Sequence, residues 1–358
     1  MKQWSKWLAA GLVAGFGVTA LPSQAAEWNF YGSARVKTWY EWTESADGKT
    51  FASGDEDDTD FDIGMQANSR VGAKVKVDDK VSGWGELGVS DKDVVLRHLI
   101  GNWDFEWGTL TIGQTRTPIG RQDSLRAHGD DAGLTAFGEP YLGRRPMIQL
   151  ESHGLKLALV KPHSITNIYN NTNTTSETDN MMPRIELSWQ QTMGIASFDA
   201  FGGYHTYTID SPAEDFDIDS YMVGAGFWLK PDPAYLRAIG YYARNARQFG
   251  QFFSPQPATF GSAKIRDEGG VVDNDVFGGA VFSGYKINSR LSAEIGYGYI
   301  QSEDDAPGAD TVKWQCFYAQ APITLYKGIT VTPEAGVMED IDSGQRITYA
   351  GAKWQANF

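Results

Sequence analysis

Hydrophobic and polar side chains alternate along much of this chain. In residues 28–42, WNFYGSARVKTWYEW, the even-numbered positions are aromatic, small or apolar, and the odd-numbered ones are mostly polar, with Trp39 as the exception. Successive side chains of a β-strand point to opposite faces of its sheet, so this pattern predicts a strand with one apolar and one polar face. Aromatic residues lie at both ends of the apolar face, as in the two aromatic belts of a membrane barrel.

The alternation recurs often enough to predict sixteen strands. A bacterial barrel made of one chain has an even number of antiparallel strands, with short periplasmic turns and longer outer loops. Short links alternate with long polar ones here, although the links near 91–93 and 342–344 are compact where long ones are expected. We therefore predict an all-β, sixteen-stranded antiparallel transmembrane β-barrel. Its predicted strands are 28–42, 63–77, 81–90, 94–105, 108–117, 145–152, 154–162, 181–190, 194–209, 217–230, 234–249, 272–287, 290–303, 311–324, 328–341 and 345–358.

One segment, residues 118–145, interrupts the alternation. It reads PIGRQDSLRAHGDDAGLTAFGEPYLGRR and combines glycine and charge without a sustained period. Long links without structure of their own are uncommon in compact proteins and are usually functional. We expect this third outer loop to fold into the lumen and constrict it; a surface loop is the alternative. Its charged residues are Arg121, Asp123, Arg126, Asp130, Asp131, Glu139, Arg144 and Arg145, with His128 between them.

The first 25 residues have the features of a secretory signal peptide. Lys2 and Lys6 precede an apolar run from Leu8 to Leu21, and a small-residue cleavage site ends at Ala25. A retained membrane helix is the alternative, but the run is shorter than the roughly 20 residues that span a bilayer. We therefore expect residues 1–25 to be removed and residues 26–358 to form an exported barrel.

The chain is acidic and carries one cysteine. Its formal net charge is -14, and removal of Lys2 and Lys6 with the signal peptide leaves -16 on 333 residues. An acidic surface without a basic stripe argues against nucleic acid as a partner. Cys316 alone cannot form a disulfide framework. The acidic run at 55–62, DEDDTDFD, predicts a solvated loop tip; calcium binding is the alternative, although the spacing is not that of an EF-hand.

Enzyme motifs are absent from the sequence. It contains no G-x-S-x-G elbow, no P-loop and no H-E-x-x-H motif, and no two of its five histidines have the spacing of metal ligands. We therefore expect no catalytic activity, no cofactor and no metal site.

Several short motifs resemble the general porins of Gram-negative outer membranes. They are Asn68-Ser69-Arg70-Val71-Gly72, Leu96-Arg97, the run from Gly108 to Gln114 with Thr117-Pro118 after it, and the terminal Phe358. The resemblance implies a homotrimer whose water-filled channels admit small hydrophilic solutes and ions by passive diffusion. It also implies contact with outer-membrane lipid and lipopolysaccharide, and recognition of Phe358 by the assembly machinery of the bacterial outer membrane.

Charged residues on the predicted polar faces form the candidate site. A charge is costly on a lipid-facing surface, so the basic residues of these faces are expected to line the lumen. The predicted basic cluster of the pore wall is Arg35, Lys37, Arg70, Lys74, Arg97 and Arg145. By resemblance, Arg70 and Arg97 match the basic wall of porins best, and Arg35 and Arg145 match it less well.

The resemblance also places acidic residues of the third loop opposite this basic cluster. Those residues are Asp123, Asp130, Asp131 and Glu139. Arg121 and Arg126 depart from the porin pattern, because they put positive charge on the acidic side. Charged rings of this kind set the selectivity of a pore. The alternative is that the arginines only pair with lumen acids and stiffen the wall.

Three other functions fit the same pattern. A substrate-specific channel for a sugar or an oxyanion would use the lumen aromatics together with Arg121 and Arg126 as a binding track. A non-conducting structural or adhesive barrel would have a plugged lumen, and a secreted β-sandwich lectin would be soluble. The preferred solute, the ion selectivity, gating and the oligomeric state are not determined by the sequence.

Overall fold

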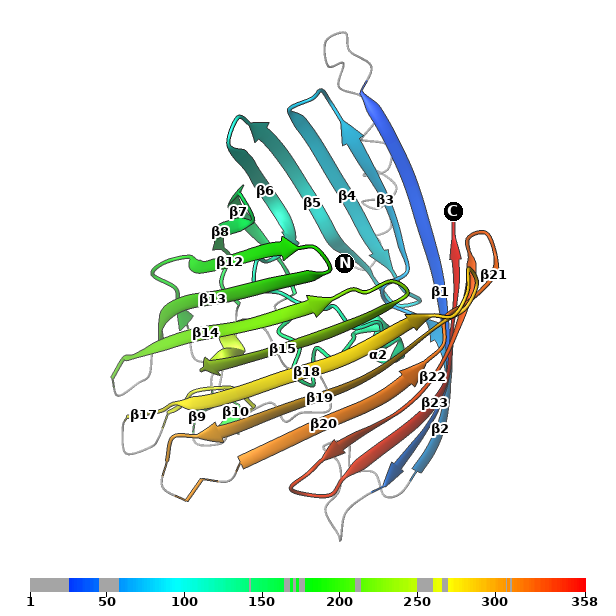
Figure 1. The fold of residues 1–358 in the computed structure, drawn as a ribbon. Coiled ribbons are helices and arrows are strands. Elements are labelled where there is room, and N and C mark those ends of the chain that lie inside the picture. The colour runs from blue at the N-terminus through cyan, green and yellow to red at the C-terminus, as the bar shows by residue number, and fades with distance from the viewer. Residues whose placement is uncertain are drawn as a thin grey trace.

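The computed structural model describes residues 26–44, 58–141, 143–163, 168–169, 172–173, 178–209, 214–249, 260–265, 270–306, 308–309 and 311–358. The predicted signal peptide lies outside these residues, as do residues 55–57 of the acidic run. The described strands follow one another around a single curved wall (Figure 1). In the described part of the chain, no helix is long and apolar enough to cross a membrane.

The wall closes where the first strand meets the last. Strand β1 (Glu27–Glu44) pairs along one edge with β23 (Arg346–Asn357) and along the other with β2 (Asp58–Met65) and β3 (Arg70–Lys76). Every pairing in this sheet is antiparallel. The remaining members are β4 (Val81–Val89), β5 (Val94–Phe105), β6 (Gly108–Arg116), β7 (Arg144–Ser152), β8 (Leu155–Val160), β11 (Thr178–Asp179), β12 (Arg184–Met193), β13 (Ala196–Ile209), β14 (Phe216–Leu229), β15 (Ala234–Arg244), β18 (Asn274–Lys286), β19 (Ser292–Asp304), β20 (Thr311–Gln320), β21 (Ile323–Tyr326) and β22 (Ile329–Asp340).

Within the described residues, these nineteen strand segments make sixteen wall strands. Segments β2 and β3 share the neighbour β1, β11 and β12 share β13, and β20 and β21 share β22, so each pair is one interrupted strand. The prediction of a sixteen-stranded antiparallel barrel is therefore confirmed.

Side-chain exposure follows the predicted alternation. On β1, Phe30 is 72% exposed, whereas Ser33 and Arg35 are 5% and 7% exposed. The apolar face thus points away from the barrel and the polar face points inward. Trp39, the aromatic exception on the polar face, is buried because its ring packs edge-on against His128 and Tyr349.

Two predicted strand boundaries differ from the observed ones by five residues. The acidic run was expected to be a loop tip, but β2 already begins at Asp58 and pairs with β1. These acids are exposed except near Asp62, whose carboxylate pairs with Lys37, so water and one cation reduce their repulsion. The strand expected to reach residue 249 ends at Arg244, because Asn245 has a left-handed φ of 50° and the 3-10 helix η1 (Ala246–Phe249) follows.

Links that are far apart in the sequence meet in a second, small sheet. Strand β9 (Ile168–Tyr169) pairs with β10 (Thr172–Asn173) and, in parallel, with β16 (Lys264–Ile265), which pairs with β17 (Val271–Val272). The wall residues Tyr207, Ile209, Phe216 and Ile218 form a buried cluster with Ala263 and Ile265 at this sheet.

The largest buried cluster joins the link between β6 and β7 to the wall. Ile119, Leu134 and Phe137 of this link are almost completely buried. They pack with inward-facing wall residues, among them Phe201, Met222, Tyr241, Val276, Phe282, Trp314 and Tyr318. These wall residues lie on β13, β14, β15, β18 and β20.

Candidate functional site

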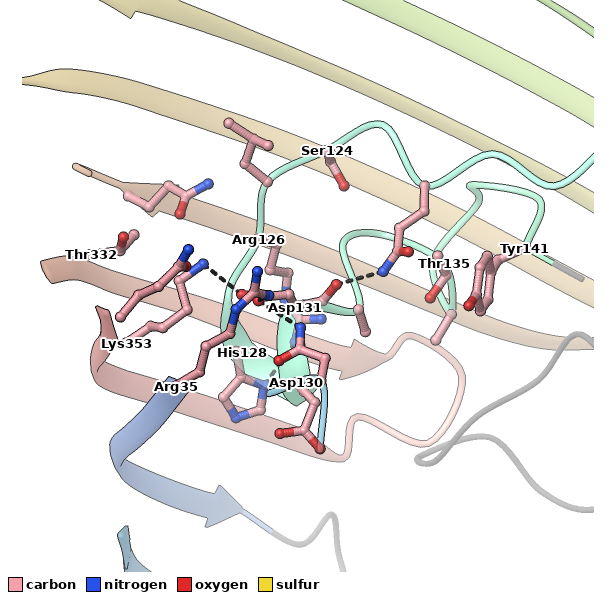
Figure 2. A pocket seen from close by; sticks show the side chains of 18 of the residues that line it. Arg35, Ser124, Arg126, His128, Asp130, Asp131, Thr135, Tyr141, Thr332 and Lys353 are labelled. Carbon is pink, nitrogen blue, oxygen red and sulfur yellow. Dashed lines mark hydrogen bonds and ion pairs between the residues drawn. The ribbon is translucent and has the colours of Figure 1, made fainter. Parts of the chain in front are cut away.

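A cavity of about 870 Å³ lies between the link that joins β6 to β7 and part of the barrel wall (Figure 2). Its wall residues come from β1, β3, β5, β6, β7, β20, β22 and β23. We call the side of the link that borders this cavity, with the facing wall, the basic side, because seven cationic side chains and three carboxylates line the cavity. The cations are Arg35, Arg70, Arg97, Arg116, Arg126, Arg144 and Lys353, and the carboxylates are Glu41, Asp130 and Asp131.

The tip of the link lies against the wall through Asp131. Its Oδ2 accepts hydrogen bonds from Nη1 of Arg35 (2.5 Å) and Nδ2 of Asn68 (2.7 Å), and its Oδ1 pairs with Nζ of Lys353 (2.8 Å). Figure 2 shows Arg35 and Lys353 pointing toward Asp131. The tip is the short element α2 (His128–Asp131), in which Gly129, Asp130 and Asp131 all have left-handed φ angles between 56° and 69°. This tight reversal turns Asp131 toward the wall.

Asp130 lines the same cavity beside Asp131. Burial raises the pKa of its carboxyl, and the charge of Lys37 opposes that rise. The predicted wall residue Lys37 itself makes an ion pair with Asp62 on β2, at 2.5 Å.

A second group of arginines surrounds one buried carboxylate, Glu86. Nε of Arg97 donates to its Oε1 (2.6 Å), Nη1 of Arg70 lies 3.8 Å from the same oxygen, and the Tyr31 hydroxyl donates to its Oε2 (2.7 Å). Glu86 is 4% exposed. Because a buried carboxylate needs cationic partners, Glu86 fixes Arg70 and Arg97 in place.

Arg116 and Arg144 have only neutral partners. Arg144 donates to Nε2 of His98 (3.1 Å) and to the Tyr141 hydroxyl (3.0 Å). Arg116 donates to Oε1 of Gln122 (2.8 Å). Among the residues that the structure describes, no carboxylate lies within ion-pair distance of either guanidinium. Their charges are therefore not neutralised by a direct partner.

Wall carboxylates hold the backbone of the link. Glu334 on β22 accepts hydrogen bonds from the backbone N–H groups of Ala127 (2.5 Å) and His128 (3.1 Å). Glu294 on β19 accepts one from Leu125 (2.8 Å). Since a buried N–H group is costly without an acceptor, both glutamates stabilise this path of the link.

Arg126 is buried behind the tip and was expected in the acidic face of the loop. It donates to the Tyr349 hydroxyl (2.9 Å), the Gly133 carbonyl (3.1 Å) and Nδ1 of His128 (2.9 Å). Arg126 is 3% exposed. It is an anchor of the link, and only a small part of its side chain is open to a solute.

Glu139 does not face the basic cluster, contrary to expectation. Its fully buried carboxylate accepts hydrogen bonds from the backbone N–H groups of Asp123 (2.7 Å), Ser124 (2.8 Å) and Leu134 (2.8 Å), and from the Ser124 hydroxyl (2.6 Å). Burial raises the pKa of this carboxyl. Glu139 therefore holds two parts of the link together.

Arg121 and Asp123 lie on the opposite side of the link, which we call the packed side. There Asp199 on β13 pairs with Nε of Arg121 (3.3 Å) and Nη1 of Arg237 (2.5 Å), and Nη2 of Arg237 pairs with Asp123 (2.9 Å). The buried Arg184 and Glu186 form a further pair at 2.7 Å. The expected opposition of Asp123 to the basic cluster is therefore wrong, because the link turns this residue toward β15.

Three predicted wall residues do not line the cavity; Lys37, which pairs with Asp62, is one of them. Lys74 lies over the ring of Trp84, 5.2 Å from its centroid, and lines a separate cavity of about 620 Å³. Arg145 is partly buried on β7 and is not a lining residue. Its neighbour Arg144 lines the cavity instead. As the first residue of β7, Arg144 follows the link, where alternation does not fix the direction of a side chain.

Sequence reasoning also missed Arg116, Lys353, Glu86 and His128. Lys353 and Glu86 do lie on the polar faces of predicted strands, and that position was the available signal. Arg116 ends β6 at the start of the link. In the described part of the chain, no group of three or more His, Cys, Asp or Glu residues is placed to hold a metal ion.

Comparison with known proteins gives a match of fold. No model of a protein family matches the chain, and no curated protein does. Among solved structures, the outer membrane channel DcaP of Acinetobacter baumannii is 18% identical with a TM-score of 0.70, over 95% of this chain and 100% of that one. The anion-selective porin from Comamonas acidovorans is 12% identical with a TM-score of 0.56, over 93% and 100%.

An outer membrane protein of Vibrio cholerae, OmpT, solved in a trimer form, is 15% identical with a TM-score of 0.55, over 93% of this chain and 100% of that one. At these identities the likeness concerns architecture, and it agrees with the strand pairing described above. This chain therefore has the fold of the sixteen-stranded outer-membrane channels and porins.

Proposed function

We propose that this protein is an outer-membrane porin through which small hydrophilic solutes and ions pass by passive diffusion. The observation that carries the proposal is the charged cavity between the link and the basic side of a closed barrel. Apolar residues such as Phe30, Ile63 and Val223 are 57% to 72% exposed on the outside of the wall. A closed barrel with an apolar exterior suits a bilayer, and a polar interior suits a water-filled channel.

The proposal includes the parts that sequence analysis expected. Residues 1–25 direct export, residues 26–358 form the barrel, and residues 118–145 narrow the channel. The trimer form of the Vibrio cholerae protein supports a homotrimer here. The function requires no catalysis, because passage through the cavity is diffusion.

Preference for anions is a second candidate, and the composition of the cavity favours it. Asp131 and Glu86 pair with four of the seven cations, and Arg126 is buried. Among the described residues, Arg116 and Arg144 have neutral partners only. An uncompensated positive wall concentrates anions and repels cations. The Comamonas porin of the same fold is described as anion-selective. A channel with a binding site for one oxyanion is the strongest form of this candidate.

Recording from the purified protein in a planar bilayer tests both candidates. We expect stepwise conductance and a reversal potential, under a gradient of potassium chloride, displaced toward the anion. A bilayer that stays sealed, together with liposomes that do not swell in small sugars, would support the non-conducting structural barrel and overturn the proposal. A reversal potential displaced toward the cation would remove the preference for anions but keep the channel. Saturable block by inorganic phosphate would favour the oxyanion site.

A further inference from the structure

His128 joins the tip of the link to three wall strands. Its Nδ1 lies 2.9 Å from Nη2 of Arg126, and its Nε2 lies 2.7 Å from Oε1 of Glu41 on β1. Its ring stacks on Tyr349 of β23, with centroids 3.9 Å apart and planes at 20°. Its backbone N–H donates to Glu334 of β22. His128 is 8% exposed, so these contacts fix both its ring and its backbone.

These partners permit one protonation state. A guanidinium can only donate hydrogen bonds, so Nδ1 of His128 must accept from Arg126. Nε2 then carries the proton and donates to Glu41. A second proton on Nδ1 would face an N–H group of Arg126 at 2.9 Å and would place two positive charges together. The neutral ring therefore fits this site, and the imidazolium does not.

The charged surroundings act in the same direction overall. The titratable and charged groups around His128 are Arg126 on the link, Glu41 and Lys37 on β1, Glu334 on β22 and Tyr349 on β23. Burial and the positive charge of Arg126 outweigh the hydrogen bond to Glu41 and lower the pKa of His128. Because the folded pKa lies below the unfolded value, the docked state loses stability as pH falls below about 6.5 toward the folded pKa.

The residues that follow His128 carry the clamp on the basic side. Gly129, Asp130 and Asp131 form the left-handed turn, and Asp131 holds Arg35 and Lys353. A turn of three residues transmits a change at His128 directly to Asp131. Release of Asp131 would leave two cations of the cavity, Arg35 and Lys353, without their carboxylate partner.

We propose that His128 is a positioning residue that docks the tip of the link onto the basic wall in its neutral form, and that its protonation releases the tip. The proposal rests on the channel function proposed above. It makes permeation sensitive to acid through one side chain, which lines the cavity. On release, Arg35 and Lys353 become available to anions.

The test compares the pH dependence of channels that differ at this residue. Reversal potential and open-channel current noise would be recorded from about pH 7 to about pH 4 in planar bilayers. In the wild type we expect acid to shift the reversal potential further toward the anion and to raise the noise. We call this shift in reversal potential and rise in noise the acid-dependent step. H128Q cannot be protonated, and its amide can still donate to Glu41, so we expect it to lack this step.

H153Q serves as the matched control, because His153 lies in the turn between β7 and β8, where Nδ1 of its ring lies 2.8 Å from the Ser152 hydroxyl. It should keep the acid-dependent step. D131N gives a second variant that does not touch His128: without the clamp there is nothing to release, so the step should again be lost. A full step in H128Q or in D131N would overturn the inference. If no variant conducts at any pH, the proposed channel function fails instead.

Discussion

The link between β6 and β7 has two unlike sides. On the packed side, each buried arginine meets carboxylates, as Arg237 meets Asp199 and Asp123, and apolar side chains such as Phe137 fill the remaining space. On the basic side, cations outnumber carboxylates around an open cavity. One short segment thus packs into the protein core on one side and borders an open cavity on the other.

The difference follows from the solvent that each side meets. A buried charge is tolerated only with a partner, so the packed side is balanced. Charges in contact with water can remain uncompensated, so the basic side is free to carry an excess. We infer that stability is determined mainly by the packed side and ion selectivity by the basic side.

The largest loss of stability is expected from Asp199→Ala on the packed side. It leaves Arg237 and Arg121 without their shared carboxylate, and loss of one partner of a buried pair costs about 3–5 kcal/mol. The midpoint of urea unfolding in detergent should fall accordingly. Glu339→Ala is the matched control, because it breaks the more exposed pair with Arg346, for which about 0–1 kcal/mol is expected. Equal midpoints for the two variants would contradict the division between the sides.

A smaller effect is expected from Tyr349→Phe, at the boundary between the sides. The hydroxyl donates to Glu334 and accepts from Arg126, and both partners are buried. Leaving buried groups with fewer partners costs about 1–3 kcal/mol. The same unfolding measurement should show this loss, while the ring contact with His128 is retained. Tyr326→Phe, at an exposed position of the wall, provides the control and should leave the midpoint unchanged.

The smallest effect on stability, with a clear effect on permeation, is expected from the double variant Arg116→Gln and Arg144→Gln. Among the described residues neither guanidinium has a carboxylate partner, so the double substitution leaves no buried carboxylate without its cation. The free energy of unfolding should therefore change by no more than about 0.5 kcal/mol. Loss of two uncompensated charges should shift the reversal potential toward the cation. An unchanged reversal potential would show that these two residues do not contribute to selectivity.

The wall was predictable because its information is local. Alternation alone predicted that Arg35, Arg70 and Arg97 point inward, and in the structure all three line the cavity. The strand ends were less predictable, since the run at 55–62 and the end of β15 depend on pairing and on one left-handed residue.

The path of the link was not predictable, because it has no period and its contacts are distant. Arg121, Asp123 and Glu139 were expected to face one wall, yet they face the packed side or the interior of the link. Their placement depends on Asp199, Arg237 and the wall glutamates. Glu294 and Glu334 did indicate such contacts. Carboxylates on the inner face of strands need hydrogen-bond donors from another part of the chain. The sequence does not say which donors those are.

The separation of these contacts along the chain bears on the order in which the molecule is completed. The acceptors for Leu125 and Ala127 lie 169 and 207 residues downstream, and the hydroxyl that meets Arg126 lies 223 residues downstream. During synthesis from the N-terminus, this stretch is made long before the strands that hold it. The backbone N–H groups of this stretch therefore lack their acceptors until the C-terminal third of the polypeptide has been made. A chain truncated there would leave these groups without the acceptors described above.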